Sequence, residues 1–525
     1  MALLLLGAVT LGGFALQAYG ATDGQGGVPL DDAWIHFQFA RNLARGEGFS
    51  FNPGQPTAGS TAPLWTLLLA GLYAAGGRFP LSGQLLSAVS FLLTLVATYL
   101  LARRLTRRRW SAWLAAAVAA VNGRLVWAGL SALETPLFAA LSLLAINAYL
   151  VDRDTGRYRL PTAVLFGLGA LTRPEGLLLF ALSAADFLAR SVGAEWKRDA
   201  PSSSQDSRIT SYVSRLTSSL SRLLPPLAVV AALVLPYALF SLRTGGHLFP
   251  NTFSAKTTFN FRPDLTFLSH VSQYLILDNP LLLPFFVLGV GALVFRARLL
   301  SAWSAGLPIV YAFLHASLYQ HGRYLIPLIP ANAVVAVAGL LVARRLALRR
   351  NWRWRGSRVM LVVLVAVLAI AGTAWRLPTM ARLYAQDVRN INQMHVALGE
   401  WVAENTSSDA VLALNDIGAI TYISERRIVD LAGLVTPRVT PLLRASDTAS
   451  RLIAFMAEQD VDYVIIFPNW FPGLAERDEV LKRVHAVRLE RRTITGGKTM
   501  VVYRADWDQD HEASGRFDQT RLSLP

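Results

Sequence analysis

Two adjacent carboxylates are the first groups in this 525-residue chain whose types and spacing could do chemistry. Asp31 and Asp32 precede a stretch in which apolar and polar residues alternate with the period of a helix: Ile35, Phe39 and Leu43 against Gln38, Arg41, Asn42 and Arg45. This pattern predicts an amphipathic helix that lies on a membrane surface. Helix capping explains one Asp. A general base or a metal ligand is the functional alternative, and the residues alone leave both open.

Four further polar clusters lie between apolar segments. Glu134 opens a predicted helix, where an acidic side chain favours the helix dipole. Arg173 and Glu175 could staple a tight turn, although ionisable groups at membrane level are costly and often functional. The other two clusters contain Asn251 with Lys256, and His321 with Arg323 and Tyr324. The whole set combines carboxylates for a hydroxyl with arginines, whose forked donors suit phosphate, as transfer from a lipid phosphate requires.

The composition indicates what kind of scaffold must position these groups. The chain is 53% hydrophobic and only 16% charged, which is more apolar surface than a soluble domain can bury. The net charge of +16 would suggest a nucleic-acid partner in a soluble protein, but here the arginines lie between apolar segments, so membrane topology accounts for them and we expect no nucleic acid. The absence of cysteine excludes disulfides and thiolate metal sites.

Eleven apolar stretches are predicted to span the membrane. They are residues 2–20, 81–102, 110–128, 133–150, 160–173, 175–190, 224–242, 277–295, 299–318, 324–343 and 359–376. The first could be mistaken for a signal peptide, but no basic residue precedes it. Leu64–Ala75 is too short to cross and predicts a re-entrant or interfacial helix.

The basic residues predict the orientation. With these spans, the loops on one side carry 23 Lys and Arg and the opposite loops carry eight. Because basic loops stay cytoplasmic, we expect a multi-pass protein of the plasma membrane with a cytoplasmic N-terminus and a C-terminal domain outside. The Ser-rich, charged segment 201–221 predicts a mobile linker.

The pattern changes after residue 376. Ala410–Leu414, Asp462–Phe467 and Met500–Tyr503 are predicted as strands, with a helix over Ser450–Gln459. We therefore expect a mainly α protein, a transmembrane bundle over residues 1–376 with a first outer loop at 21–80, followed by a small extracytoplasmic α/β domain over 377–525. No glycine-rich phosphate loop supports a nucleotide site, and no internal repeat supports a transporter.

Several motifs resemble those of a known family. Asp31–Gly54 resembles the first outer loop of membrane-embedded GT-C glycosyltransferases, most closely bacterial arabinofuranosyltransferase-like members of the mycobacterial cell-wall type. Protein O-mannosyltransferases and lipid A aminoarabinose transferases are more distant. The likeness extends over about residues 1 to 470 and includes Ser60–Trp65, Ser131–Pro136, Thr172–Gly176, His321–Tyr324, Asp416–Tyr422 and Asp430–Leu434. The resemblance implies a polyprenyl-phosphate sugar donor, inverting transfer outside the membrane and an Asp of the first loop as base.

These lines lead to one hypothesis for the site. An Asp of the pair takes a proton from an acceptor hydroxyl on a glycan, lipid or protein, and we favour Asp31 as base with Asp32 as acceptor contact. Groups expected at the donor phosphate are Arg173, Arg323, Lys256, His321 and Tyr324. Groups expected at the substrate are Trp34, His36, Arg41, Trp65, Glu134, Glu175 and Asn251.

Several points stay open in this hypothesis. The transferred sugar could be a pentofuranose, and the sequence does not decide whether Asp31 and Asp32 hold a divalent cation. The alternatives to an enzyme are a transporter or flippase of lipid-linked glycans and a non-catalytic glycan-binding membrane protein.

Overall fold

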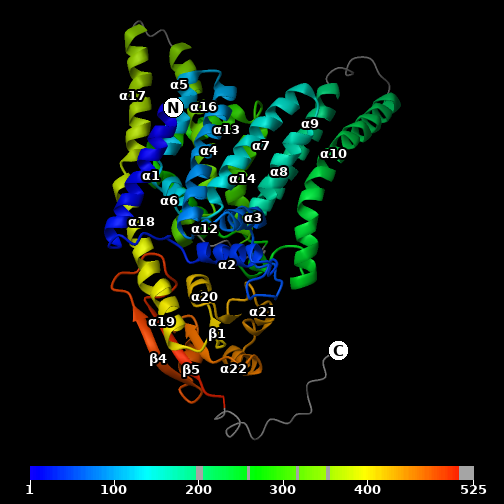
Figure 1. The fold of residues 1–525 in the computed structure, drawn as a ribbon. Helices are drawn as coiled ribbons and strands as arrows, with labels where there is room; N and C mark the ends of the chain where they lie inside the picture. Colours follow the sequence, from blue (N-terminus) through cyan, green and yellow to red (C-terminus); the bar gives the residue numbers. More distant parts are fainter. Residues whose placement is uncertain (197–204, 257–260, 315–318, 350–354, 508–525) are drawn as a thin grey trace.

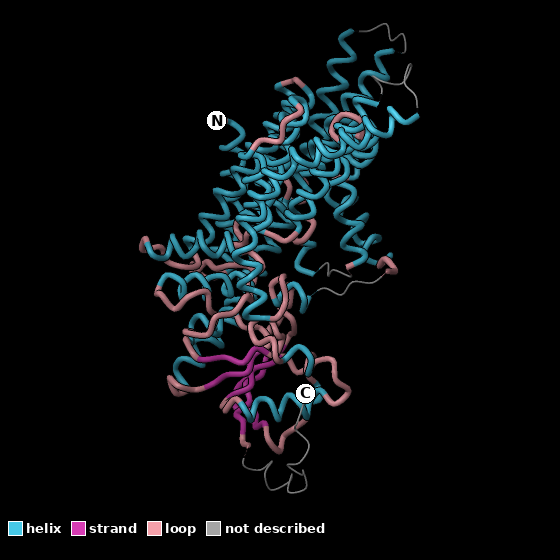
Figure 2. Tube along the Cα trace, turned by 90° about the vertical axis from the view of Figure 1, so that its right-hand side faces the viewer, coloured by secondary structure: helices cyan, strands magenta, loops and turns pink. Residues whose placement is uncertain are grey.

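A helical bundle, a middle layer and a small α/β domain are stacked in this computed structural model, which describes residues 1–196, 205–256, 261–314, 319–349 and 355–507 (Figure 1). The middle layer contains α2 (Asp32–Ala44) and α3 (Pro63–Ala74), which lie between the bundle and the C-terminal domain. The chain is mainly helical, as predicted, and its strands gather in the C-terminal domain (Figure 2).

Long apolar helices build the bundle. They are α1 (Ala2–Ala21), α4 (Leu81–Thr106), α5 (Arg109–Ala120), α6 (Gly123–Gly129), α7 (Thr135–Thr155), α8 (Leu160–Thr172), α9 (Glu175–Trp196), α10 (Gln205–Gly245), α12 (Leu265–Asp278), α13 (Leu283–Leu293), α14 (Arg298–Phe313), α16 (Ile329–Arg349) and α17 (Arg355–Ala374). Within the described residues, six helices are long and apolar enough to cross a membrane, or eight if each of two bent pairs counts as one span. The count of eleven spans stays a prediction.

One predicted span is bent, and another, 277–295, begins at a bend. The stretch 110–128 divides into α5 and α6 at an angle of 69°. Asn122 explains the break, because its side chain accepts a hydrogen bond from the Leu125 amide (3.2 Å) and caps α6. Asn279 acts similarly between α12 and α13, where its side chain accepts from the Leu281 amide (3.0 Å).

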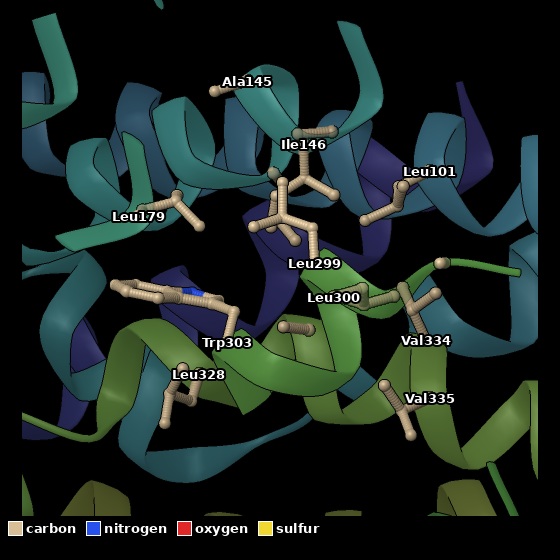
Figure 3. Packing of buried hydrophobic residues seen from close by; sticks show 14 of the residues in the cluster. Leu101, Ala145, Ile146, Leu179, Leu299, Leu300, Trp303, Leu328, Val334 and Val335 are labelled. Carbon is tan, nitrogen blue, oxygen red and sulfur yellow. The ribbon is translucent and has the colours of Figure 1, made fainter. Parts of the chain in front are cut away.

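The interior of the bundle is filled by large apolar side chains. Trp303 of α14 is fully buried and meets the edge of Phe138 of α7, with ring centroids 6.1 Å apart. Figure 3 shows Trp303, Leu299 and Leu300 packed among residues of the neighbouring helices. This packing holds α4, α7, α9, α14 and α16 in one rigid unit, from whose end the site loops emerge.

Most of the predicted basic loops meet at the end of the bundle that lies away from the C-terminal domain. Arg153, after α7, donates to the Arg296 carbonyl between α13 and α14 (2.6 Å). Arg190 of α9 donates to the Phe295 carbonyl of the same loop (3.1 Å). The predicted linker 201–221 is corrected in part, because α10 already begins at Gln205; residues 201–204 lie outside the described residues.

The helix α2 forms where the sequence predicts it, but its polar face is covered by protein rather than open to water. Its polar residues Gln38, Arg41 and Asn42 are as buried as its apolar ones. Asn42 donates to the Phe51 carbonyl (2.8 Å), and Arg41 donates to the Tyr422 carbonyl of the C-terminal domain (2.8 Å). Backbone carbonyls satisfy this polar face in place of water, so α2 can be covered on both sides.

After α17 the chain continues as α18 (Leu377–Ile391), a π-helical segment (Asn392–Val396) and α19 (Ala397–Asn405), which lead into the C-terminal domain. Its five-stranded sheet has the order β2-β1-β3-β5-β4. The strands β2, β1 and β3 are parallel to one another, and β5 is antiparallel to both of its neighbours, β3 and β4. The strands are β1 (Val411–Leu414), β2 (Arg427–Asp430), β3 (Tyr463–Ile466), β4 (Leu481–Arg488) and β5 (Thr499–Ala505). The smaller helices are α20 (Gly418–Ser424), α21 (Val439–Leu442), α22 (Thr448–Glu458) and α23 (Pro472–Ala475).

The three predicted strands and the helix α22 are confirmed. The sequence analysis did not identify β2 and β4, which form the two edges of the sheet. β2 is only four residues long, and β4 is largely exposed with polar side chains, so neither shows a clear apolar run.

Candidate active site

An ion pair joins the middle layer to the bundle at the centre of the site. Asp32 is the first residue of α2, and its carboxylate pairs with Nη1 of Arg323, in the loop before α16. Both side chains are mostly buried, 23% exposed for Asp32 and 11% for Arg323. Arg323 also lies over the ring of Tyr324, 5.2 Å from its centroid. A carboxylate and a guanidinium therefore face each other where a small opening to solvent remains.

Arg173 also lies near Tyr324, with its guanidinium carbon 5.2 Å from the centroid of the same ring. It donates from Nη1 to Glu134 (3.2 Å) and from Nη2 to Glu175 (2.8 Å). The Tyr311 hydroxyl donates to the same Glu175 oxygen. Arg173 is thus held between two carboxylates, which its positive charge stabilises in a nearly water-free setting.

The network continues from Glu134 to α2 and α3. Nε2 of His36 lies 3.8 Å from a Glu134 oxygen. Its other ring nitrogen, Nδ1, lies 3.4 Å from the hydroxyls of Thr66 and Ser60. Six separate segments of the chain therefore contribute to one connected set of polar side chains. Of the residues predicted from sequence, it unites Asp32, His36, Glu134, Arg173, Glu175, Arg323 and Tyr324.

Local sequence explains how the two arginines reach these positions. Arg173 precedes Pro174 and is extended (φ −154°, ψ 141°), as expected for a residue before proline, so α8 ends there and the chain turns. Gly176 lets this turn close, because a Cβ would contact the backbone of Gly169 and Ala170. Before Arg323, Gln320 and His321 both take left-handed backbone angles (φ 58° and 60°), a strained arrangement often found at functional sites.

Asp31 takes different partners from its neighbour. Its two carboxylate oxygens accept hydrogen bonds from the amides of Gly418 and Ala419 in the C-terminal domain, each 2.7 Å long. It makes no side-chain capping bond to α2. Burial raises the pKa of Asp31 to about 6, opposed by the charge of His395 and assisted by that of Asp416. Asp31 and Asp32 therefore have different partners in the protein, and within the described residues no group of three acidic or histidine side chains is arranged to hold a metal ion.

Three predicted substrate residues instead connect the layers. Trp34 packs against Tyr422 with ring centroids 5.3 Å apart. Arg41 pairs with Glu425 at 2.7 Å. Nε1 of Trp65 donates to the Ala132 carbonyl (3.2 Å). These contacts make all three residues part of the packing around the site rather than of its polar network.

The remaining predicted residues lie outside the network. His321 hydrogen-bonds through Nε2 to Asp387 of α18 (2.8 Å), which also accepts from Trp127. Asn251 begins α11 (Asn251–Lys256). Its backbone N–H donates to the Ala58 carbonyl (3.1 Å), whereas its side chain has no hydrogen-bond partner among the described residues. The side chain of Lys256 lies outside the described part of the structure.

Sequence reasoning missed some members of the network. Tyr311 lies inside a predicted span, and a polar side chain within an apolar helix is the signal that could have drawn attention to it. Thr66 and Ser60 carry no such signal, because isolated hydroxyl residues are common in helices and loops. His395 and Asp416, near Asp31, come from the C-terminal domain, and only tertiary contact relates them to the site.

A cavity of about 230 Å³ lies among α5, α12, α13, α14, α16 and α17, and Arg124 in its lining contacts the carbonyl of His321. Aliphatic and aromatic side chains line most of it. At one end, Nε of Arg124 hydrogen-bonds to Asp278 (3.0 Å), and its guanidinium lies over the ring of Tyr274. A smaller cavity of about 120 Å³ shares Arg124 and is also lined by His321 and Arg376. The larger cavity is therefore mainly apolar, with the Arg124–Asp278 ion pair in its lining.

Comparison with solved structures identifies the fold. ArnT from Cupriavidus metallidurans in the apo state aligns with a TM-score of 0.60 and 13% identity, covering 96% of this chain and 98% of ArnT. The same protein bound to undecaprenyl phosphate gives a TM-score of 0.56 over the same shares. The oligosaccharyltransferase AglB from Archaeoglobus fulgidus, in complex with an inhibitory peptide and a dolichol-phosphate, gives 0.55 with 15% identity, covering 96% of this chain and 74% of AglB.

At the level of sequence, one family model matches part of the C-terminal region. Residues 383–513 match a family described as a domain of unknown function (DUF8728). A search of curated protein sequences gives no significant match.

Proposed function

We propose that this chain, which has the fold of the GT-C glycosyltransferases, transfers a sugar from a polyprenyl-phosphate donor to an acceptor hydroxyl. The observation that carries the proposal is the Asp32–Arg323 pair, set beside the Glu134–Arg173–Glu175 network. This arrangement offers a base for a hydroxyl and a cation for a phosphate within one partly open site. Carboxylates such as Glu134 are also suitable acceptors for the hydroxyls of a sugar.

Asp32 is the base in this proposal. Both oxygens of Asp31 already accept amide hydrogens and its side chain is buried, so it has little capacity to receive a substrate proton. Asp32 instead faces Arg323, a partner that a donor phosphate would attract. This assignment reverses the one favoured from sequence, where the two carboxylates could not be told apart.

The reaction proceeds by direct displacement. Asp32 takes the proton of the acceptor hydroxyl as its oxygen forms a bond to the anomeric carbon of the donor. The bond from that carbon to the phosphate oxygen breaks on the opposite face, so the configuration inverts and polyprenyl phosphate leaves. Arg323 stabilises the negative charge that grows on the phosphate. Arg173, whose donors already contact two carboxylates, holds Glu134 and Glu175 in place rather than binding phosphate.

The larger cavity is the proposed place for the start of the isoprenoid chain. Its polar end is marked by Arg124, whose Nη1 donates to the His321 carbonyl (3.5 Å), two residues before Arg323. A lipid chain in this cavity would therefore leave its phosphate close to the loop that carries His321 and Arg323. ArnT, which shares the fold, binds undecaprenyl phosphate. The pentofuranose identity of the sugar and the acceptor remain predictions, as does action at the outer face of the plasma membrane.

Substitution of Asp32 by Asn tests the proposal. We expect Asp32→Asn protein in lipid nanodiscs to bind polyprenyl-phosphate arabinofuranose as the wild type does. Its transfer of labelled sugar to membranes lacking this protein should fall by about 10²- to 10⁴-fold, because the amide cannot accept the proton. Asp23→Asn is the matched control: Asp23 is exposed in the same loop, and Asn tolerates its left-handed backbone (φ 51°). Normal transfer by Asp32→Asn would refute the assignment, and it would favour a carrier or binding protein if donor binding persisted.

A further inference from the structure

We infer that the C-terminal domain positions the catalytic carboxylate: Gly418, with the nearby His395–Asp416 pair, holds Asp31 and thereby sets the place of Asp32. The inference rests on the proposed function and gives that domain a role in catalysis. Its basis is the contact between the first loop and α20, which joins residues 387 positions apart in the chain.

The contact between Asp31 and Gly418 has no spare room. The Asp31 carboxylate receives the amide hydrogens of Gly418 and Ala419, one on each oxygen. A Cβ on Gly418 would overlap the Asp31 carbonyl oxygen and lie 2.7 Å from both carboxylate oxygens. Gly418 has an ordinary backbone conformation, so the close approach of Asp31, and not a special φ, is what requires glycine there.

A second set of side chains in the same domain surrounds Asp31. His395 is fully buried and hydrogen-bonds through Nε2 to Asp416 (3.0 Å). It belongs to the π-helical segment Asn392–Val396, a local widening of the helix that is frequent at functional sites. His395 and Asp416 both act on Asp31 through their charges. One imidazole therefore lies among the two carboxylates that meet at this junction.

The position of Asp31 reaches Asp32 through the backbone. Asp31 has helical angles (φ −63°, ψ −32°), and its carbonyl accepts the first hydrogen bond of α2, from the Trp34 amide (2.9 Å). Because Asp32 is the next residue, a shift of Asp31 moves the start of α2 and the carboxylate that faces Arg323. Displacement of a reacting group by about 1 Å can lower a rate by roughly 10²-fold, even when no catalytic atom is removed.

The Gly418→Ala substitution is the sharpest test. Alanine suits α20, so the domain should fold, but the new methyl group must push Asp31 away. We expect kcat to fall by about 10²-fold while affinity for polyprenyl phosphate stays unchanged. Gly71→Ala in α3 is the matched control, because a Cβ there meets no atom within 4 Å. Wild-type kcat in folded Gly418→Ala protein would overturn the inference.

Three further variants separate positioning from simple attachment of the domain. Glu425→Gln weakens the ion pairs with Arg41 and Arg45 near the C-terminal end of α2 without touching Asp31, and it should leave kcat near wild type. Asp31→Asn keeps one accepting oxygen, and Asp31→Ala keeps none, so kcat should fall in the order wild type, Asn, Ala at constant donor affinity. Equal losses in Glu425→Gln and Asp31→Asn would indicate attachment only and would overturn the inference. Because Asp32→Asn tests the base directly, these results can fail while the proposed function stands.

Discussion

The carboxylate of Asp32 pairs with the guanidinium of Arg323, which joins the first residue of α2 to the loop before α16. The pair connects the middle layer with the bundle at the one place where both proposed chemical roles meet. If Arg323 moves from Asp32 to an arriving phosphate, the same event frees the base and neutralises the leaving group. Arg323 is therefore the residue whose replacement should affect donor binding and transfer together.

We expect Arg323→Ala to lower transfer by roughly 10²-fold or more, since a charge-stabilising donor at the leaving group is lost. Arg323→Lys should recover only part of this, because lysine keeps the charge but not the forked donors. Initial rates at several donor concentrations, in nanodiscs, provide the measurement. Wild-type kinetics in the Ala variant would remove Arg323 from the phosphate site.

Arg173→Met should act mainly on folding. It leaves Glu134 and Glu175, which are 11% and 12% exposed, without their cation, and unpairing buried charges costs about 3–5 kcal/mol. Thermal unfolding in detergent should show a lower Tm and less folded protein. Combining Arg173→Met with Glu175→Gln should recover part of the loss, because one uncompensated charge is removed. A stable Arg173→Met protein with weakened donor binding would instead support the phosphate role predicted from sequence.

Filling the larger cavity should separate the lipid chain from the headgroup. Ala336 lines this cavity, and Ala336→Phe would occupy part of its volume. Affinity for long-chain polyprenyl phosphate should fall by about tenfold or more, the equivalent of ~1.4 kcal/mol. A water-soluble donor with a short chain should bind as it does to the wild type, which serves as the control. An equal loss for both donors would indicate general damage rather than a chain-binding cavity.

The stability of the junction around Asp31 should depend on pH. The pKa of Asp31 is raised from 3.8 to about 6, so between these values the folded protein holds a proton that the unfolded chain has released. Its contribution to the free energy of unfolding is therefore present below about pH 4 and is lost as pH rises to about 6. Burial lowers the pKa of His395, but the charges of Asp31 and Asp416 outweigh this and raise it. The protonated His395 therefore also stabilises the folded protein, and this stability is lost as the pH rises further.

The Asp31→Asn variant removes the Asp31 part of this effect. Its Tm should change less than that of the wild type between pH 4 and 6, when both proteins are melted in the same detergent. Parallel curves over that range would show that Asp31 does not carry the proton.

Reporter fusions test the predicted topology. The 23 basic residues on one side and eight on the other predict that a reporter fused after Arg358 is cytoplasmic. A reporter at the C-terminus should be outside, because the span 359–376 lies between the two points. Finding both reporters on one side would contradict the model of eleven spans.

The sequence by itself determined the class of the protein and most of its elements. Apolar runs such as 81–102 predict helices because burying a spanning segment depends on the residues of that segment alone. The same local logic found β1, β3 and β5 but not the exposed edge β4. It also found Asp32, Glu134, Arg173 and Arg323, since charged residues between apolar segments stand out whatever their partners.

Only the tertiary structure decided which partners each of these residues has. Asp31 and Asp32 are neighbours of the same type, and their difference comes entirely from distant partners: amides of α20 for one and Arg323 for the other. Similarly, the donors of Arg173 contact Glu134 and Glu175, which is why we propose a positioning role for it in place of the phosphate role predicted from sequence. Hydrogen bonds and ion pairs act over a few ångströms, so the role of a charged group depends on which segments the fold brings next to it, and local sequence does not contain that information.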